Sequence, residues 1–114
     1  MDRQTIAQQP ALIPGTLDLL ILKTLARGPL HGYGIAHFLL ETSGNILEVG
    51  EGSLYPALQR LLVNGWTDAE WKLSETGRRA RFYKLTAAGR KRLKTEEQDF
   101  ERMVGVIRLV LRSL

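Results

Sequence analysis

One segment of the chain, TLDLLILKTLAR at residues 16–27, is apolar on nearly every side of a helix. Such a helix has no face for solvent, so other elements must surround it. We therefore expect it at the centre of a single domain, which suits a chain of 114 residues of which 44% are hydrophobic. Thr16 is the expected N-cap, and Gly28-Pro29 is expected to end the helix.

A second helix is expected from His31 to about Thr42, because Ile35, Phe38 and Leu39 form an apolar stripe before Ser43-Gly44. The piece that follows, NILEVGEG, is short and partly apolar. It fits either one small strand or an irregular turn.

The third expected helix lies in EGSLYPALQRLLVNGW, residues 51–66. Its leucines recur at helical spacing and form an inner face: Leu54, Leu58, Leu61 and Leu62. Ser53 is the expected N-cap, which puts Pro56 in the first turn, where a missing N–H has no partner to lose. The polar residues on the other side of this helix do nothing for a core, so they are candidates for contact with a partner.

A β-hairpin is expected next. Residues 66–73 alternate apolar and polar, SETGRR is turn-like, and residues 81–85 form the return strand. Three helices followed by a hairpin is the order of a winged helix-turn-helix. The expected fold class is therefore mainly α (α+β), with the hairpin as the wing.

Positive charge is concentrated in one block. The chain carries a net charge of +4, yet residues 78–94 contain eight cations and no acid, so the rest sums to −4. The cations are Arg78, Arg79, Arg81, Lys84, Arg90, Lys91, Arg92 and Lys94. A local basic block indicates a polyanion partner. A solvated charged face is the alternative reading, and the block alone does not decide between them.

Several classes of protein are not expected. The chain has no cysteine, and His31 and His37 lack the spacing of metal ligands, so no metal site or cofactor is predicted. No nucleophile stands beside a base, which argues against an enzyme. The N-terminal residues have no apolar signal region, and no run of 18 apolar residues spans a membrane, so a cytoplasmic protein is expected.

In a winged helix-turn-helix the third helix enters the major groove of DNA with its N-terminal residues at the base edges. The expected DNA-facing residues are therefore Ser53, Tyr55, Pro56, Gln59 and Arg60. The side chain of Gln59 suits adenine, and that of Arg60 suits guanine or phosphate. Double-stranded DNA is the predicted partner.

Three motifs in this order, LHGYGIAHFL, EGSLYPALQRLLVNGW and GRRARFYKLTAAGRKRL, resemble the PadR family of bacterial transcriptional regulators. The resemblance covers about residues 14–92. It implies a winged helix in which Tyr33, Ser53, Tyr55, Pro56 and Arg60 contact DNA, with wing arginines near the minor groove. Those arginines are Arg78, Arg79 and Arg81. Gly34 departs from the family pattern, which more often has an acidic residue there.

The last helix is expected to hold two chains together. Leu93, Phe100, Ile107 and Leu114 repeat every seven residues, and Met103 and Val110 lie beside them. A helix from Ala87 to Arg112 would be about 39 Å long at roughly 1.5 Å per residue, more than one small domain can cover. A homodimer is therefore expected, with a flexible arm (1–13), a DNA-binding domain (14–85) and a dimerisation helix (86–114), like the short PadR subgroup.

The family resemblance implies a repressor, and it raises release by a small aromatic ligand. A pseudo-palindromic operator is expected because a two-fold homodimer presents two equal helices. Trp66 and Trp71 could either pack in the core and sheet or line such a ligand site. A second class of function stays open, in which the winged helix is a protein–protein interaction module with a basic face. The polar first turn of the third helix favours DNA over that alternative.

Overall fold

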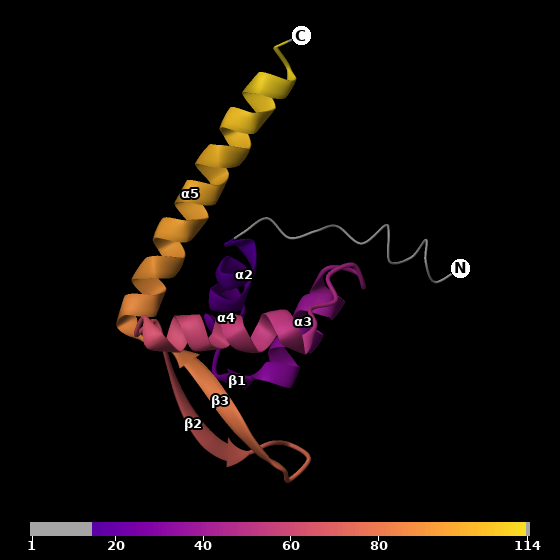
Figure 1. The fold of residues 1–114 in the computed structure, drawn as a ribbon, viewed down its shortest axis with the longest axis vertical. Helices are drawn as coiled ribbons and strands as arrows, with labels where there is room; N and C mark the ends of the chain where they lie inside the picture. Colours follow the sequence, from indigo (N-terminus) through magenta and orange to yellow (C-terminus); the bar gives the residue numbers. More distant parts are fainter. Residues whose placement is uncertain (1–14, 114) are drawn as a thin grey trace, which may run out of the picture.

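The structure is a computed structural model that describes residues 15–113, so the expected arm (1–13) and Leu114 lie outside the described residues. Figure 1 shows a helical body, a β-hairpin wing and a long C-terminal helix. This is the winged-helix arrangement that the sequence predicts, and that prediction is confirmed. The elements in chain order are α2 (Thr16–Leu25), β1 (Leu30–His31), α3 (Gly32–Thr42), α4 (Glu51–Val63), β2 (Thr67–Leu73), β3 (Arg79–Leu85) and α5 (Ala87–Leu111).

Helix α2 lies at the centre, as its all-round apolar character predicts. It packs against α3, α4, α5 and β3. Ile21, Leu22 and Leu25 of α2 are almost fully buried, and Thr24 is tolerated among them because its hydroxyl donates to the Leu20 carbonyl at 2.8 Å. The other helices bury their apolar stripes against it with Ile35, Leu39, Leu54, Ala57, Leu58 and Leu61.

Helix α4 begins two residues before the expected cap. Gly50 is extended and forms the N-cap, and its carbonyl accepts the amides of Ser53 (3.1 Å) and Leu54 (2.9 Å). Ser53 is therefore inside the helix, and the prediction that it caps the helix is wrong. Pro56 consequently lies in the second turn, where it has no N–H to donate to the Gly52 carbonyl. Gly15, rather than Thr16, likewise occupies the cap position of α2.

Helix α3 begins where the sequence predicts. His31 is its N-cap, and the Nδ1 atom of His31 accepts the Gly34 amide at 2.9 Å. A Cβ atom on Gly34 would lie 2.7 Å from Cδ1 of Leu30, so the absence of a side chain at Gly34 gives Leu30 room to pack. Between α3 and α4, residues 45–50 contain no strand, which settles the open question in favour of an irregular turn.

The sheet has three antiparallel strands in the order β1-β3-β2. Strand β1 has two residues and pairs Leu30 with Tyr83 and His31 with Phe82. No sequence pattern predicted it. Strands β2 and β3 form the expected wing, with β3 starting at Arg79 instead of Arg81, and their register places Trp71 opposite Arg81.

Helix α5 is joined closely to the loop that ends α4. Thr86 caps α5 by accepting the Gly89 amide at 3.0 Å, and the Thr86 hydroxyl donates to the Gly65 carbonyl at 2.7 Å. The backbone amide of Thr86 donates to the Trp66 carbonyl at 3.1 Å. Gly89 approaches so closely that a Cβ atom there would lie 1.9 Å from the same carbonyl oxygen. We call these contacts the α4–α5 joint.

Beyond its first turns α5 leaves the body, as Figure 1 shows. Leu93 was expected to contact a second chain. It packs instead in the core of its own chain, where it is 7% exposed, so it offers no surface for dimerisation. The physical reason is that the face of α5 bearing the heptad first meets α2, where Lys23 also pairs with Glu97 at 3.0 Å. Further along, Phe100, Met103, Ile107 and Val110 are exposed.

Candidate nucleic-acid interface

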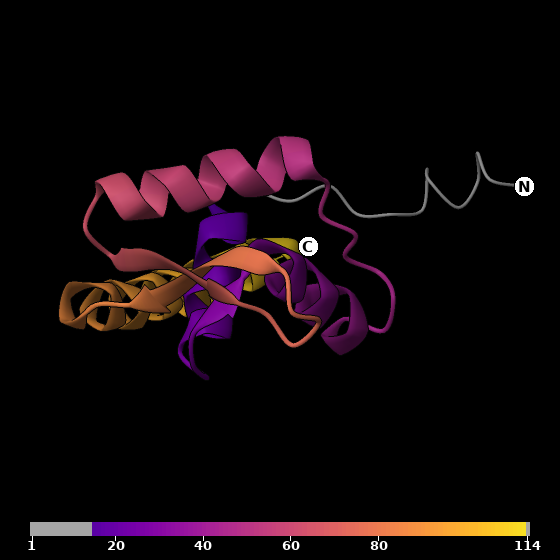
Figure 2. The same cartoon turned by 90° about the horizontal axis from the view of Figure 1, so that it is seen from below.

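Helix α4 lies alone on one side of the domain, with α2, α3, the sheet and α5 beneath it in the view of Figure 2. Successive residues of a helix are about 100° apart, so Pro56 and Gln59 point directly away from the buried leucines. Both are exposed. The outer face of α4 is therefore exposed and accessible to a partner.

The two flanks of α4 differ. Tyr55 lies on the flank that faces the wing, while Ser53 and Arg60 lie on the opposite flank. The Tyr55 ring rests against the start of α3, where a Cβ on Gly32 would be 3.0 Å from its hydroxyl oxygen. Because Gly32 has no side chain, the Tyr55 ring can pack closely against α3, between α3 and the wing. Tyr33, which follows Gly32, is 74% exposed beside it.

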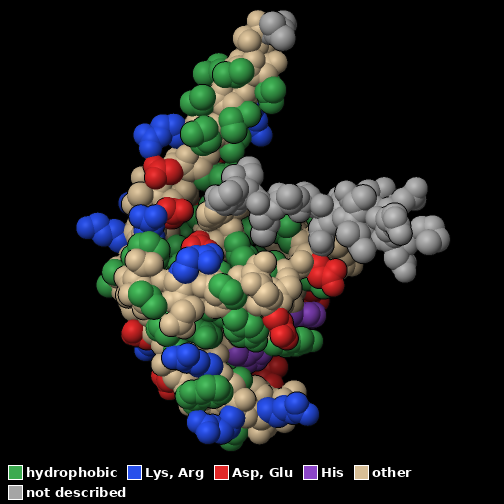
Figure 3. Space-filling model, in the orientation of Figure 1, with side chains coloured by type: hydrophobic (Ala, Val, Ile, Leu, Met, Phe, Trp, Pro, Cys, Tyr) green, Lys and Arg blue, Asp and Glu red, His purple; other side chains and the backbone are tan. Residues whose placement is uncertain are grey.

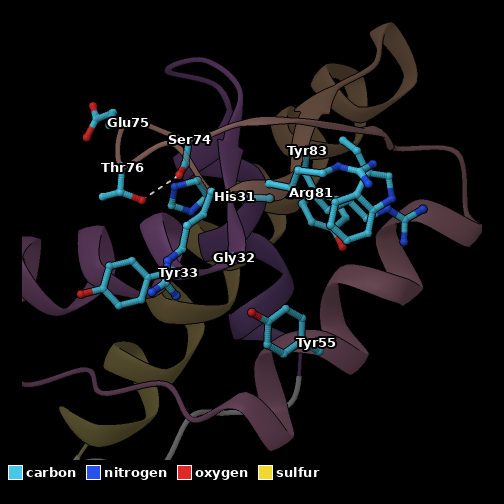
Figure 4. A pocket seen from close by; sticks show the side chains of 13 residues that line it. His31, Gly32, Tyr33, Tyr55, Ser74, Glu75, Thr76, Arg81 and Tyr83 are labelled. Atoms are coloured by element: carbon cyan, nitrogen blue, oxygen red, sulfur yellow. Dashed lines mark hydrogen bonds between the residues drawn. The ribbon is translucent and has the colours of Figure 1, made fainter.

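A groove with a volume of about 750 Å³ runs between the helices and the wing. In Figure 4, Tyr33 and Tyr55 line it from the helices, and Arg81 and Tyr83 line it from β3. Trp71 and Arg79 also line it from the wing, with the Arg79 guanidinium 5.2 Å from the centre of the Trp71 ring, and Glu75 adds one carboxylate. The groove combines aromatic faces with guanidinium groups, which suits an anionic strand or an aromatic anion.

The two tryptophans have different environments. Trp66 is partly buried against the core, and the Arg92 guanidinium lies 4.5 Å from its ring centre. Trp71 is 58% exposed on the groove side of the wing. Trp66 therefore matches the packing interpretation, whereas Trp71 lies on the surface that could meet a ligand or DNA.

The predicted wing cations lie at and near the turn. Arg78 is in the turn, Arg79 begins β3, and both are exposed, while Arg81 is half-buried. Figure 3, which looks onto α4, shows Lys and Arg side chains gathered over the wing. Lys84 also lies on β3, whereas the other cations of the basic block belong to the first turns of α5: Arg90, Lys91, Arg92 and Lys94. The block is therefore divided between the wing and α5.

Arg60 makes an interaction that the sequence analysis missed. Its Nη2 donates to Oδ1 of Asp18 at 2.8 Å and its Nε donates to Oδ2 at 3.3 Å. The hydrogen bond to Asp18, and secondarily the negative charge of that carboxylate, raise the pKa of Arg60. Asp18 lies in the first turn of α2, where a negative charge also interacts favourably with the helix dipole. Its position as the one acid in an apolar helix was a signal for a specific partner.

Within residues 15–113 no three histidine or acidic side chains gather to hold a metal ion, and no helix in that range is long and apolar enough to cross a bilayer.

The model of the transcriptional regulator PadR-like family matches residues 21–95. The chain belongs to the PadR-like family. The predicted resemblance is thereby confirmed, and the match spans the winged helix and the first turns of α5. Members of this family are transcriptional regulators.

Solved structures of transcriptional regulators have the same fold. A transcriptional regulator from Clostridium thermocellum is 30% identical, with a TM-score of 0.76 over 82% of this chain and 91% of the other. A PadR family transcription regulator from Clostridium difficile is 27% identical, with a TM-score of 0.74 over 85% of this chain and 99% of that one.

A third relative is an uncharacterised 37.1 kDa protein in the transposon TN4556 of Streptomyces fradiae, 42% identical over 88 residues. The aligned part is 77% of this chain but 24% of that relative, so the two share a module and not a whole protein.

Proposed function

We propose that this PadR-like protein is a DNA-binding repressor that acts as a homodimer on a pseudo-palindromic operator. The observation that carries the proposal is the exposed outer face of α4, which lies next to a wing that carries arginines. The major groove is about 12 Å wide and admits a helix about 10–12 Å in diameter. The exposed outer face of a helix that lies beside a cationic hairpin suits such a groove.

The proposed contacts divide by chemistry. Pro56 and Gln59 would face the bases, because they point straight out from α4. The hydroxyls of Tyr33, Ser53 and Tyr55 would meet phosphates at its two flanks. The wing cations Arg78, Arg79 and Arg81 would neutralise phosphates or enter the minor groove. Arg60 would also reach a base edge from its flank of α4.

The proposed dimer rests on the exposed apolar part of α5. Phe100, Met103, Ile107 and Val110 are 41–64% exposed and continue the same helical face on which Leu93 packs against α2. An apolar surface of this length on a helix that leaves the body favours a second copy, because a two-fold pair would cover both stripes at once. Two α4 helices related by a two-fold axis would read a pseudo-palindrome.

Release by a small aromatic ligand belongs to the same proposal. A volume of about 750 Å³ is within the usual range of ligand sites, roughly 300–1,000 Å³. Trp71, Tyr55 and Arg81 would offer an aromatic anion both stacking faces and a counter-charge. A ligand there would occupy the surface proposed for DNA. We place the protein with its DNA in the cytoplasm and assign it no catalytic step.

Selection from a random duplex library, followed by footprinting of the selected sequence, tests the proposal. The expected result is a two-fold symmetric motif whose half-sites are about one or two helical turns apart, one turn being about 34–36 Å. Equal affinity for all duplexes, together with capture of an acidic protein by the wing, would instead support the interaction-module alternative.

A further inference from the structure

The carboxylate of Asp18 and the guanidinium of Arg60 join the first turn of α2 to the third turn of α4 across 42 residues of sequence. We call this contact the Asp18–Arg60 clamp. The Asp18 side chain is 23% exposed and that of Arg60 is 55% exposed, so the carboxylate is the more enclosed partner and the guanidinium still reaches solvent. Asp18 is therefore the fixed member of the clamp, and Arg60 is the member that remains accessible to a ligand.

The clamp uses one edge of the guanidinium. An arginine has five N–H groups in a planar fork, and Asp18 accepts from Nε and from Nη2. Nη1 and the second N–H of Nη2 form the end of the fork, and this pair is the one that can donate to O6 and N7 of a guanine. Binding to Asp18 along one edge and to a base at the end is compatible with one planar arrangement.

We propose that Asp18 is a positioning residue that holds Arg60 as a reader of base edges and prevents it from serving as a general phosphate contact. This inference rests on the proposed function. Holding the side chain before DNA arrives removes the ordering cost that a free arginine would bear on binding. The Asp18 carboxylate also neutralises the charge of Arg60, so the electrostatic attraction between Arg60 and a phosphate is weak. Hydrogen bonds from Arg60 to a neutral pair of acceptors, such as O6 and N7 of guanine, depend on geometry and are retained.

The competing explanation is a purely structural ion pair that joins α2 to α4 and has no effect on how Arg60 meets DNA. The two explanations differ in what Asp18→Asn does to DNA binding. A structural pair affects specific and random duplexes alike. A positioning role lowers only the preference for the operator, and it frees the charge of Arg60 to strengthen binding to any duplex.

The experiment uses the full chain and compares dissociation constants for the selected operator and for a random duplex over a range of salt. The variants are Asp18→Asn, Arg60→Ala and Arg60→Lys, the last of which keeps the charge but loses the fork. Glu97→Gln is the matched control, because it also removes the carboxylate of an ion pair with α2. In that pair, Glu97 of α5 binds Lys23 of α2, so α4 takes no part in it. Thermal unfolding of each variant is measured alongside.

For Asp18→Asn we expect the preference for the operator to fall by about fivefold or more, with relaxed discrimination at the same base pair that Arg60→Ala relaxes. The salt dependence for random duplex should become steeper, by about one phosphate equivalent. Arg60→Lys should lose the preference as Arg60→Ala does.

Behaviour of Asp18→Asn that matches Glu97→Gln would overturn the inference, and so would a full operator preference in Arg60→Lys. A wild-type protein that binds all duplexes equally would instead refute the proposed function itself.

Discussion

Replacing Gly89 with alanine probes the α4–α5 joint. The added Cβ would lie 1.9 Å from the Trp66 carbonyl oxygen, and a backbone oxygen cannot swing away as a flexible side chain does. Relief to an ordinary contact at 3.4 Å requires a movement of about 1.5 Å. If α5 pivots at Leu93, four residues or about 6 Å along the axis, this corresponds to a tilt of about 14°. At Ile107, about 21 Å beyond the pivot, the helix would move by roughly 5 Å.

We expect Gly89→Ala to lower the free energy of unfolding by about 1–3 kcal/mol, the usual cost of overpacking. The melting temperature should then fall by on the order of 5–15 °C. Circular dichroism on heating and in urea measures this at one fixed protomer concentration, because dimerisation would couple to stability.

Gly105→Ala is the control, since the same substitution later in α5 meets nothing within 4 Å. A helix-interior glycine costs about 0.5–1 kcal/mol relative to alanine, so Gly105→Ala should stabilise the protein or leave it unchanged. If Gly89→Ala were as stable as Gly105→Ala, the close approach of α5 to Trp66 would not exist in solution, and the reasoning would fail.

Three further outcomes are expected. Glutamate at both Phe100 and Ile107 should yield a folded monomer in sedimentation equilibrium, because it charges the exposed stripe of α5; a dimer that persists contradicts the proposed interface. Tyr55→Phe should weaken operator binding without lowering the melting temperature, since only the hydroxyl is lost; unchanged binding would remove the phosphate contact. Alanine at both Arg78 and Arg79 should make the salt dependence shallower by about two phosphate equivalents; an unchanged slope would place the wing tip away from DNA.

The sequence was sufficient for the elements whose signals are local. The leucine spacing in α4 and the alternation in β2 are properties of neighbouring residues, and both elements were predicted within a few residues. Strand β1 escaped because two residues cannot show a period, and its partners, Tyr83 and Phe82, lie about fifty residues away. The start of α4 was misplaced because a glycine with no side-chain bond, Gly50, took the place of an expected Ser53 cap.

The sequence predicted which residues belong to the candidate site, but it did not predict which of them contact one another. Which residues of α4 point outward follows from the helical period, so Pro56 and Gln59 could be chosen from sequence. The partner of Arg60 could not, because Asp18 meets it only through the packing of α2 on α4. A heptad pattern shows that Leu93 lies on an apolar face, but not whether that face packs in the core of its own chain or against a second chain. The structure places Leu93 in the core of its own chain.

The α4–α5 joint has a consequence for how such a protein can change its target. Its hydrogen bonds join the Gly65 and Trp66 carbonyls to Thr86, so they do not depend on the side chains along the outer face of α4. Exposed positions such as Pro56, Gln59 and Val63 can therefore be exchanged without loosening the core or altering the angle at which α5 departs. Under the proposed function, libraries confined to those positions would sample new operator sequences on an unchanged frame, with half-site spacing held constant while base preference is varied.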